Sequence, residues 1–177
     1  MRKNKLMTKV FAGMMVTALV LQSTPMAPVS AQAAQKVVIK TQKQLDAALK
    51  NKNVTAIEIR TNSGTTFSIK RGDYNKSIVV NSTKAKVVNN GEFKSVTVKN
   101  ATSFTEKADN NKINVTDKNL NLTVSKGADN SKITVSSTGG KVNVKADGKV
   151  ATVTVNKKTT LKVSGSTPNA VKITSNA

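Results

Sequence analysis

Apolar and polar residues alternate in short segments that recur from about residue 57 onward. Alternation with a period of two predicts short β-strands, each with two side chains buried on one face. One series recurs every 17 to 21 residues or so and comprises Ile57-Ile59, Ile78-Val80, Val96-Val98, Ile113-Val115, Ile133-Val135, Val153-Val155 and Val171-Ile173. A second series lies between these segments and comprises Phe67-Ile69, Ala85-Val87, Leu122-Val124, Val142-Val144 and Leu161-Val163, with Phe104 as a weaker member.

The residues between the strands repeat as well. "KADNNKINV" begins at Lys107, and "GADNSKITV" begins at Gly127. Asn, Asp and Gly in these connections are turn residues. A period of about 20 residues with two strands predicts coils that stack because no single coil can bury its own apolar residues. We therefore predict a right-handed parallel β-helix, or β-solenoid, of about six coils. Strand spacings of about ten residues also fit an antiparallel sandwich or barrel, but the copied turn residues argue against that fold.

One segment has a helical pattern instead. In "TQKQLDAALKN", Leu45, Ala48 and Leu49 fall on one helical face, and Thr41 with Gln44 fits a capping box. We predict a short capping helix at about residues 41–50, just before the first strand pair, which covers the apolar end of the solenoid. No comparable cap is visible after Ile173.

Two stretches resemble known proteins. "VVIKTQKQLDAALKNKNVTAIEIRT" resembles the first coil of right-handed parallel β-helix proteins of the pectin-lyase-like class, where a capping helix precedes the coil. "FSIKRGDYNKSIVVNSTKAKVVNNGEFKSVTVKNA" is similar to β-helical surface proteins secreted by Clostridia-type Gram-positive bacteria. The resemblance extends from about Val37 to Ile173. It implies a fold and a cellular location, and it implies no reaction.

The first 33 residues have the features of a secretory signal peptide. Four basic residues precede an apolar run from Val10 to Leu21, which is too short to span a bilayer, and Ala31-Gln32-Ala33 fits a cleavage pattern. An uncleaved membrane anchor is the alternative. We predict a single solenoid domain over residues 34–177, without a transmembrane segment after cleavage. The domain would be secreted or held non-covalently at the cell wall of a Gram-positive bacterium. The chain has no Cys, so no disulfide braces it.

The net charge of the chain is strongly positive. There are 29 Lys and Arg and nine Asp and Glu. Without the signal peptide the net charge is about +16, which attracts polyanions. Export makes teichoic acid, anionic lipid or acidic polysaccharide the expected partners, and nucleic acid is not expected. Candidate polyanion-binding residues are Lys112, Lys132, Lys141, Lys145, Lys162 and Lys172. Alternatively, Lys keeps a strand-rich surface soluble and its edges unpaired.

Few residues in the chain suggest catalysis. It has no His and no Cys, so the commonest general bases and nucleophiles are missing. Asp109, Asp129 and Asp147 are spaced to stack on successive coils, where they could bind calcium or, as we expect, serve as turn residues. Arg71-Gly72-Asp73 is interpreted as a turn between strands. We therefore predict a non-enzymatic module without cofactor or metal. The alternative is a diverged polysaccharide lyase or hydrolase, which would need acids gathered in one cleft.

Overall fold

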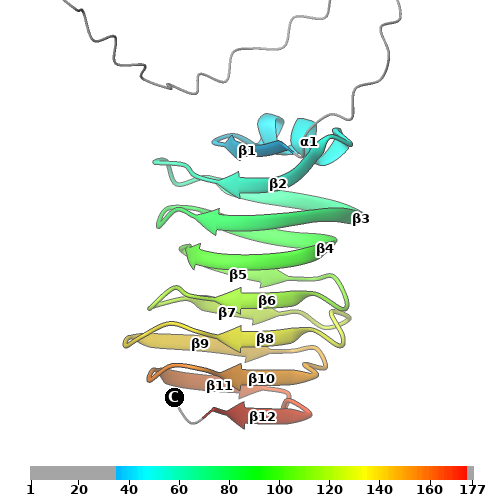
Figure 1. The fold of residues 1–177 in the computed structure, drawn as a ribbon. Coiled ribbons are helices and arrows are strands. Elements are labelled where there is room, and N and C mark those ends of the chain that lie inside the picture. The colour runs from blue at the N-terminus through cyan, green and yellow to red at the C-terminus, as the bar shows by residue number, and fades with distance from the viewer. Residues whose placement is uncertain (1–34, 175–177) are drawn as a thin grey trace, which may run out of the picture. The chain divides into compact units, whose positions relative to one another are not determined.

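The computed structural model describes residues 35–174, and these form a parallel β-solenoid of about seven turns, each of about 19 residues, with one short helix (Figure 1). The predicted signal peptide, residues 1–33, lies outside the described residues. The elements are β1 (Gln35–Ile39), α1 (Gln42–Lys50), β2 (Val54–Ile59), β3 (Thr66–Asn81), β4 (Lys86–Asn100), β5 (Ser103–Glu106), β6 (Lys112–Val115), β7 (Asn121–Val124), β8 (Lys132–Val135), β9 (Lys141–Ala146), β10 (Thr152–Val155), β11 (Thr160–Gly165) and β12 (Ala170–Ile173).

The strands form two faces. The front sheet, as seen in Figure 1, consists of β1, β2, β6, β8, β10, β12 and the second halves of β3 and β4. The back sheet consists of β5, β7, β9, β11 and the first halves of β3 and β4. All strand pairs are parallel. The first predicted series stacks in the front sheet in the predicted register, since Ile57, Ile78, Val96, Ile113, Ile133, Val153 and Val171 are successive partners.

The back sheet departs from the predicted pairing at two places. Phe67 pairs with Val87, so the partner of the segment Phe67-Ile69 is Val87-Asn89 and not the predicted Ala85-Val87. Further along, Leu122 pairs with Val144, whereas Leu161 pairs with Val142. Strand β9 is six residues long and pairs with β7 through its second half, which accounts for this two-residue offset.

A strand before the helix adds a turn that the sequence analysis missed. Strand β1 pairs in parallel with β2 over Ile39 and Ile59, so the helix follows the first strand and does not precede all of them. The predicted count of about six coils is therefore one too few. The sequence carries the signal for this strand, because Val37 and Ile39 stand 20 residues before their partners Ile57 and Ile59.

The predicted helix and its cap are confirmed. The Thr41 side chain accepts the backbone N–H of Gln44, and the Gln44 side chain accepts the backbone N–H of Thr41, which completes the capping box. Leu45, Ala48 and Leu49 are buried and join the core cluster, so the helix covers apolar surface at its end of the solenoid. Within the described region, the helix is too short and too polar to cross a membrane.

A buried lysine fixes the loop after the helix. Lys76 is only 7% exposed, and its ammonium group donates hydrogen bonds of 2.7 Å to the backbone carbonyls of Asn51 and Val54. These carbonyls lie at the end of α1 and the start of β2, where a cation also interacts favourably with the helix dipole. Lys76 therefore stabilises the fold and is not part of the basic surface.

The repeated Ala-Asp-Asn segments hold neighbouring coils together. The carboxylate of Asp109 accepts the backbone N–H of Asp129, and the carboxylate of Asp129 accepts the backbone N–H of Lys149. Asn110 and Asn130 adopt positive φ angles of 61° and 60°, a conformation that Asn tolerates. The third position of this ladder is Lys149, so the predicted stacking of Asp147 is wrong. Asp147 instead follows Ala146, the strand partner of Val124, and stands two residues before Lys149. The longer strand β9 accounts for this shift.

The last described coil is open. Val171 and Ile173 of β12 are 53% and 74% exposed, and Leu161 of β11 is only partly buried. In the inner coils the equivalent residues, such as Ile133 and Val135, are at most 1% exposed.

Candidate functional site

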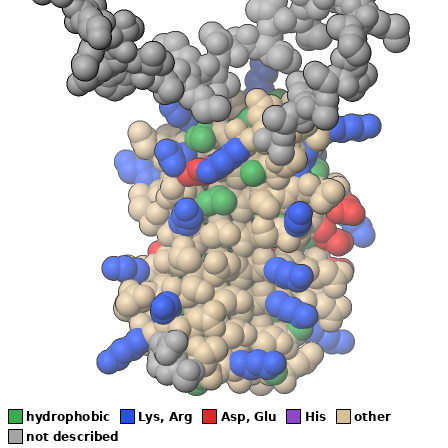
Figure 2. Space-filling view, in the orientation of Figure 1, with side chains coloured by type: hydrophobic (Ala, Val, Ile, Leu, Met, Phe, Trp, Pro, Cys, Tyr) green, Lys and Arg blue, Asp and Glu red, His purple; other side chains and the backbone are tan. Residues whose placement is uncertain are grey.

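The six lysines selected from the sequence are all exposed, but they do not form one patch. Lys112, Lys132 and Lys172 lie on the front sheet, whereas Lys141, Lys145 and Lys162 lie on the back sheet. Figure 2 shows basic side chains spread over the face in view, with the acidic ones gathered mainly at one edge. The basic surface is therefore distributed over the solenoid.

Lys112 and Lys132 are the only two of the six that are strand partners in register. They are paired between β6 and β8, so their backbones lie one coil apart, at about 4.8 Å. The next residue in this column is Thr152, and Lys172 belongs to a different column with Thr154.

Along one corner, Lys141 lies beside two lysines that the sequence analysis did not select. The backbone N–H of Lys141 donates to the carbonyl of Lys118, at 2.7 Å, and the N–H of Gly139 donates to the carbonyl of Lys158, at 2.8 Å. Lys118, Lys141 and Lys158 therefore belong to the same corner on three successive coils. Lys158 is offset by two residues, because the register partner of Lys141 is Thr160. All three lysines are exposed. We call them the corner row. The corner row cannot be recognised from the spacing of these lysines in the sequence, because Lys141 begins strand β9 whereas Lys118 and Lys158 lie in loops.

Lys145 differs from the other candidates in having an acidic neighbour. Its ammonium group forms an ion pair of 3.0 Å with Asp147. Both side chains are well exposed, so the pair contributes little to stability. It nevertheless lowers the local positive charge, and Lys145 is a weaker candidate for binding an anion than Lys112 or Lys132.

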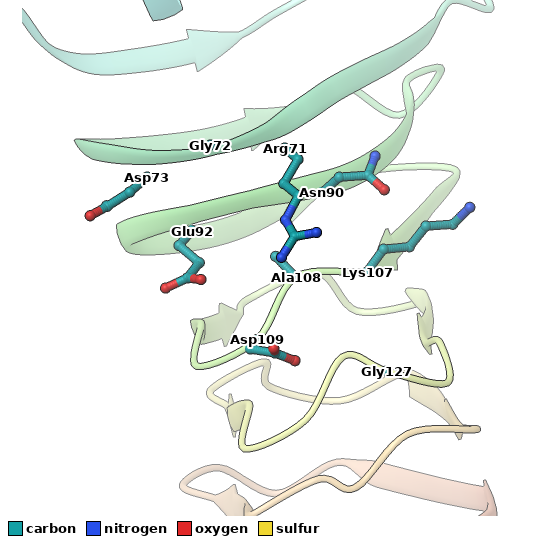
Figure 3. Close-up of a pocket in the computed structure, with 9 residues that line it drawn as sticks. All are labelled: Arg71, Gly72, Asp73, Asn90, Glu92, Lys107, Ala108, Asp109 and Gly127. Atoms are coloured by element: carbon teal, nitrogen blue, oxygen red, sulfur yellow. The ribbon is translucent and has the colours of Figure 1, made fainter.

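A polar hollow of about 430 Å³ lies at another corner (Figure 3). Three successive coils supply its charged residues: Arg71 and Asp73 from β3, Glu92 from β4, and Lys107 and Asp109 from the loop after β5. The rest of the lining is Gly72, Asn90, Ala108 and Gly127. Three of the nine acids of the chain thus line one hollow.

The Arg-Gly-Asp tripeptide lines this hollow, and its predicted turn conformation is wrong. Residues 71–73 lie inside β3, which continues unbroken through the corner. Gly72 pairs with Gly91, and Asp73 pairs with Glu92, with a register shift on either side. Parallel pairing with β4 keeps this segment extended where the turn-forming residues suggested a reversal. The pairing also places the Asp73 and Glu92 side chains on neighbouring coils, on the same side of the hollow (Figure 3).

A buried carboxyl group lies behind the hollow. Glu106 is 0% exposed and occupies an inward position of the back sheet, where it is the strand partner of Asn89 and Val124. Its carboxyl group accepts hydrogen bonds from the Asn89 side chain and from the backbone N–H groups of Lys107 and Ala108. Burial raises the pKa of Glu106 to about 7, although these hydrogen bonds act in the opposite direction.

Two asparagines complete this polar cluster. The Asn89 side chain donates to the carbonyl of Gly91 and accepts its N–H. The Asn111 side chain accepts the N–H of Phe93 and donates to the carbonyl of Gly91. The Asn111 side chain thus makes the hydrogen bonds to β4 that a neighbouring strand would otherwise make at this corner. Sequence analysis missed the cluster, although Asn89 and Glu106 each stand two residues after an inward apolar residue and so share its face.

The arrangement does not form a metal centre. Among residues 35–174, no group of three or more Asp, Glu, His or Cys side chains is placed to hold a metal ion. Asp109 and Asp129 use their carboxylates to bind backbone N–H groups of the next coil. The hollow can instead offer separate positive and negative groups to a polar ligand.

Comparisons of the chain with protein-family models, with curated protein sequences and with solved structures gave no significant match.

Proposed function

We propose that this solenoid is a secreted or cell-surface module that binds a linear anionic polymer of the cell envelope, such as teichoic acid or an acidic polysaccharide, without chemical turnover. The observation that supports the proposal is the placement of exposed lysines on successive coils. The corner row presents three lysines and the front sheet presents the pair Lys112 and Lys132. The resemblance to β-helical surface proteins of Gram-positive bacteria gives the proposed location.

Cations held on successive coils of a rigid solenoid suit a flexible polymer with regularly spaced charges. Each exposed ion pair is worth only about 0.2–1 kcal/mol and is screened by salt. Several pairs formed with one chain add together, because the first contact raises the effective concentration of the next. Binding of this kind is sensitive to salt and to the arrangement of the lysines, and it is tolerant of the fine chemistry of the polymer.

The arrangement can be tested with two matched triple variants. The row variant Lys118→Gln, Lys141→Gln and Lys158→Gln removes the corner row. The control variant Lys43→Gln, Lys52→Gln and Lys86→Gln removes three exposed lysines from α1, from the loop after it and from the start of β4, away from the corner row. Binding to purified poly(glycerol phosphate) is measured by titration calorimetry at low and at high salt.

The row variant should lose about tenfold in affinity at low salt, since three contacts of about 0.5 kcal/mol are removed. The control variant should lose distinctly less. Equal losses in the two variants would show that only net charge matters and that the row has no role. Binding that does not weaken as salt rises would contradict the electrostatic proposal as a whole.

A diverged polysaccharide lyase or hydrolase remains the second candidate, and the hollow is the observation that favours it. Arg71 lies there with Asp73, Glu92 and Asp109, so the acids are gathered as that candidate requires. The test is incubation with polygalacturonate, with and without calcium, followed by detection of unsaturated products and new reducing ends. Product formation that Arg71→Gln abolishes would favour the enzyme over the binding module.

A further inference from the structure

Four of the five charged residues in the hollow form no ion pair within the described part of the chain; the fifth, Asp109, binds the backbone N–H of Asp129. The ion pairs within the described part of the chain are Lys36–Glu58, Arg60–Glu58 and Lys145–Asp147, and none of them involves the hollow. Arg71, Asp73, Glu92 and Lys107 line one cavity, yet none lies within ion-pair distance of another. All four side chains are exposed. Their charges are therefore free to interact with a ligand.

The acidic side chains Asp73 and Glu92 and the basic side chain Arg71 lie on different sides of the hollow. Figure 3 shows Asp73 and Glu92 projecting together on one side, and Arg71 reaching across the middle toward Ala108. Asp73 and Glu92 are register partners, so their backbones lie about 4.8 Å apart. Two like charges on neighbouring strands repel each other, and a cation placed between them removes the repulsion. Arg71 offers a planar donor group suited to a phosphate or carboxylate.

We infer that this hollow binds a zwitterionic unit of the polymer, with a ligand ammonium group between Asp73 and Glu92 and a ligand phosphate or carboxylate beside Arg71. This inference rests on the proposed function and names the chemistry of the repeating unit. A volume of about 430 Å³ is within the usual range for small-ligand sites and accommodates one such unit.

Other ligand classes fit the hollow less well. A purely anionic polymer would meet three carboxylates, those of Asp73, Glu92 and Asp109, and would be repelled there. A neutral sugar would need an aromatic platform, and the residues that line the hollow include none. A metal ion is disfavoured because the carboxylates are not placed to share one.

The experiment compares two probes and two matched variants. The probes are poly(glycerol phosphate) and the same polymer carrying glycyl esters, which add one primary ammonium group each. The hollow variant is Asp73→Asn with Glu92→Gln. The control variant is Asp46→Asn with Asp147→Asn, which raises the net charge by the same amount away from the hollow. Affinities are measured by titration calorimetry at low salt.

The unmodified protein should bind the glycylated polymer about fivefold more tightly than the plain one, which corresponds to about 1 kcal/mol. The hollow variant should lose this preference while binding the plain polymer at least as tightly as before, because it has become more positive. The control variant should keep the preference. If the hollow does not bind the ammonium group, net charge alone sets the affinity. Both variants would then bind both probes more tightly than the unmodified protein does.

The outcomes separate the two proposals. If neither probe binds to the unmodified protein, the proposed function fails. If both probes bind but the plain polymer is preferred, or the hollow variant behaves like the control variant, the inference about the hollow is wrong while the proposed function stands. Alkaline hydrolysis of the glycyl esters provides an internal check, since it should abolish the preference.

Discussion

Replacing Glu106 should change how the stability of the solenoid depends on pH. Glu106 is fully buried, has no cationic partner in its hydrogen-bond network and has a pKa of about 7, raised chiefly by burial, against an ordinary value of 4.5. The folded protein therefore holds this proton more tightly than the unfolded chain does. The free energy of unfolding is then greatest below about pH 4.5 with respect to this group. It falls as pH rises toward 7 and is constant above that value.

The size of the effect follows from the difference in pKa. About 2.5 pKa units at about 1.4 kcal/mol each correspond to a loss of about 3 kcal/mol between pH 4.5 and pH 7. That is a large fraction of the stability of an ordinary domain. The chain contains no His, the side chain that ordinarily titrates in this range, so the slope reports mainly on Glu106.

The assay is urea denaturation at pH 5, 6, 7 and 8. The chain has no Trp, so far-ultraviolet circular dichroism is the suitable probe of unfolding. Glu106→Gln removes the titration but keeps an oxygen that can accept the N–H groups of Lys107 and Ala108. Its free energy of unfolding should be nearly independent of pH over this range. Glu92→Gln, which removes an exposed carboxylate from the hollow, serves as the control and should keep the slope of the unmodified protein.

Only the slopes are compared, because Gln at position 106 also changes the hydrogen bond to Asn89 and with it the absolute stability. If the unmodified protein is equally stable at pH 5 and pH 8, the buried carboxyl group is ionised throughout and the reasoning from burial is refuted. The same conclusion follows if Glu106→Gln retains the original slope.

Two further changes test the core and the corner. Val135→Asp places an unpaired charge at a fully buried position and should lower the free energy of unfolding, measured by urea denaturation, by several kcal/mol. Thr134→Asp, whose side chain faces outward, should be nearly neutral. Similar effects of the two changes would show that the assigned faces of the strand are wrong. Gly91→Ala would place a Cβ atom 2.5 Å from the Tyr74 ring and should lower the free energy of unfolding by about 1–3 kcal/mol. Gly64→Ala has open space around it and should cost much less; equal losses would show that the ring moves aside freely.

The period of the apolar residues was enough to predict the front sheet. Ile113, Ile133 and Val153 stack in the predicted register because each coil there has the same path between strands. In the back sheet the same reasoning failed at Ala85 and Val142. Ala85 ends the loop before β4 and so mimics the start of a strand. Val142 lies inside β9, where two apolar pairs overlap: Val142-Val144 faces β11 in register, whereas Val144-Ala146 faces β7. A two-residue offset keeps the same face buried, so the sequence pattern does not reveal it.

The hollow could not be predicted from the sequence for a related reason. Arg71, Glu92 and Asp109 are separated by 17 residues or more, and neither Arg71 nor Glu92 belongs to a residue pattern that repeats at the coil period. Their meeting depends on β3 and β4 continuing through the corner as strands, whereas the sequence predicts a turn at Arg71-Gly72-Asp73. The pairing of Gly72 with Gly91 supplied the backbone hydrogen bonds that overrode this local preference.

The polar cluster around Glu106 lies at the same corner as the hollow, and the two are connected through the loop that follows Glu106. The inward column of the back sheet reads Ile69, Asn89, Glu106, Val124, so it is polar only on the two coils behind the hollow. Glu106 binds the N–H groups of Lys107 and Ala108, which line the hollow, and so fixes the path of the loop that forms its floor. A purely apolar column would leave those N–H groups without these partners. The buried carboxyl group thus holds, at a cost in stability near neutral pH, the loop whose residues Lys107 and Ala108 line the hollow.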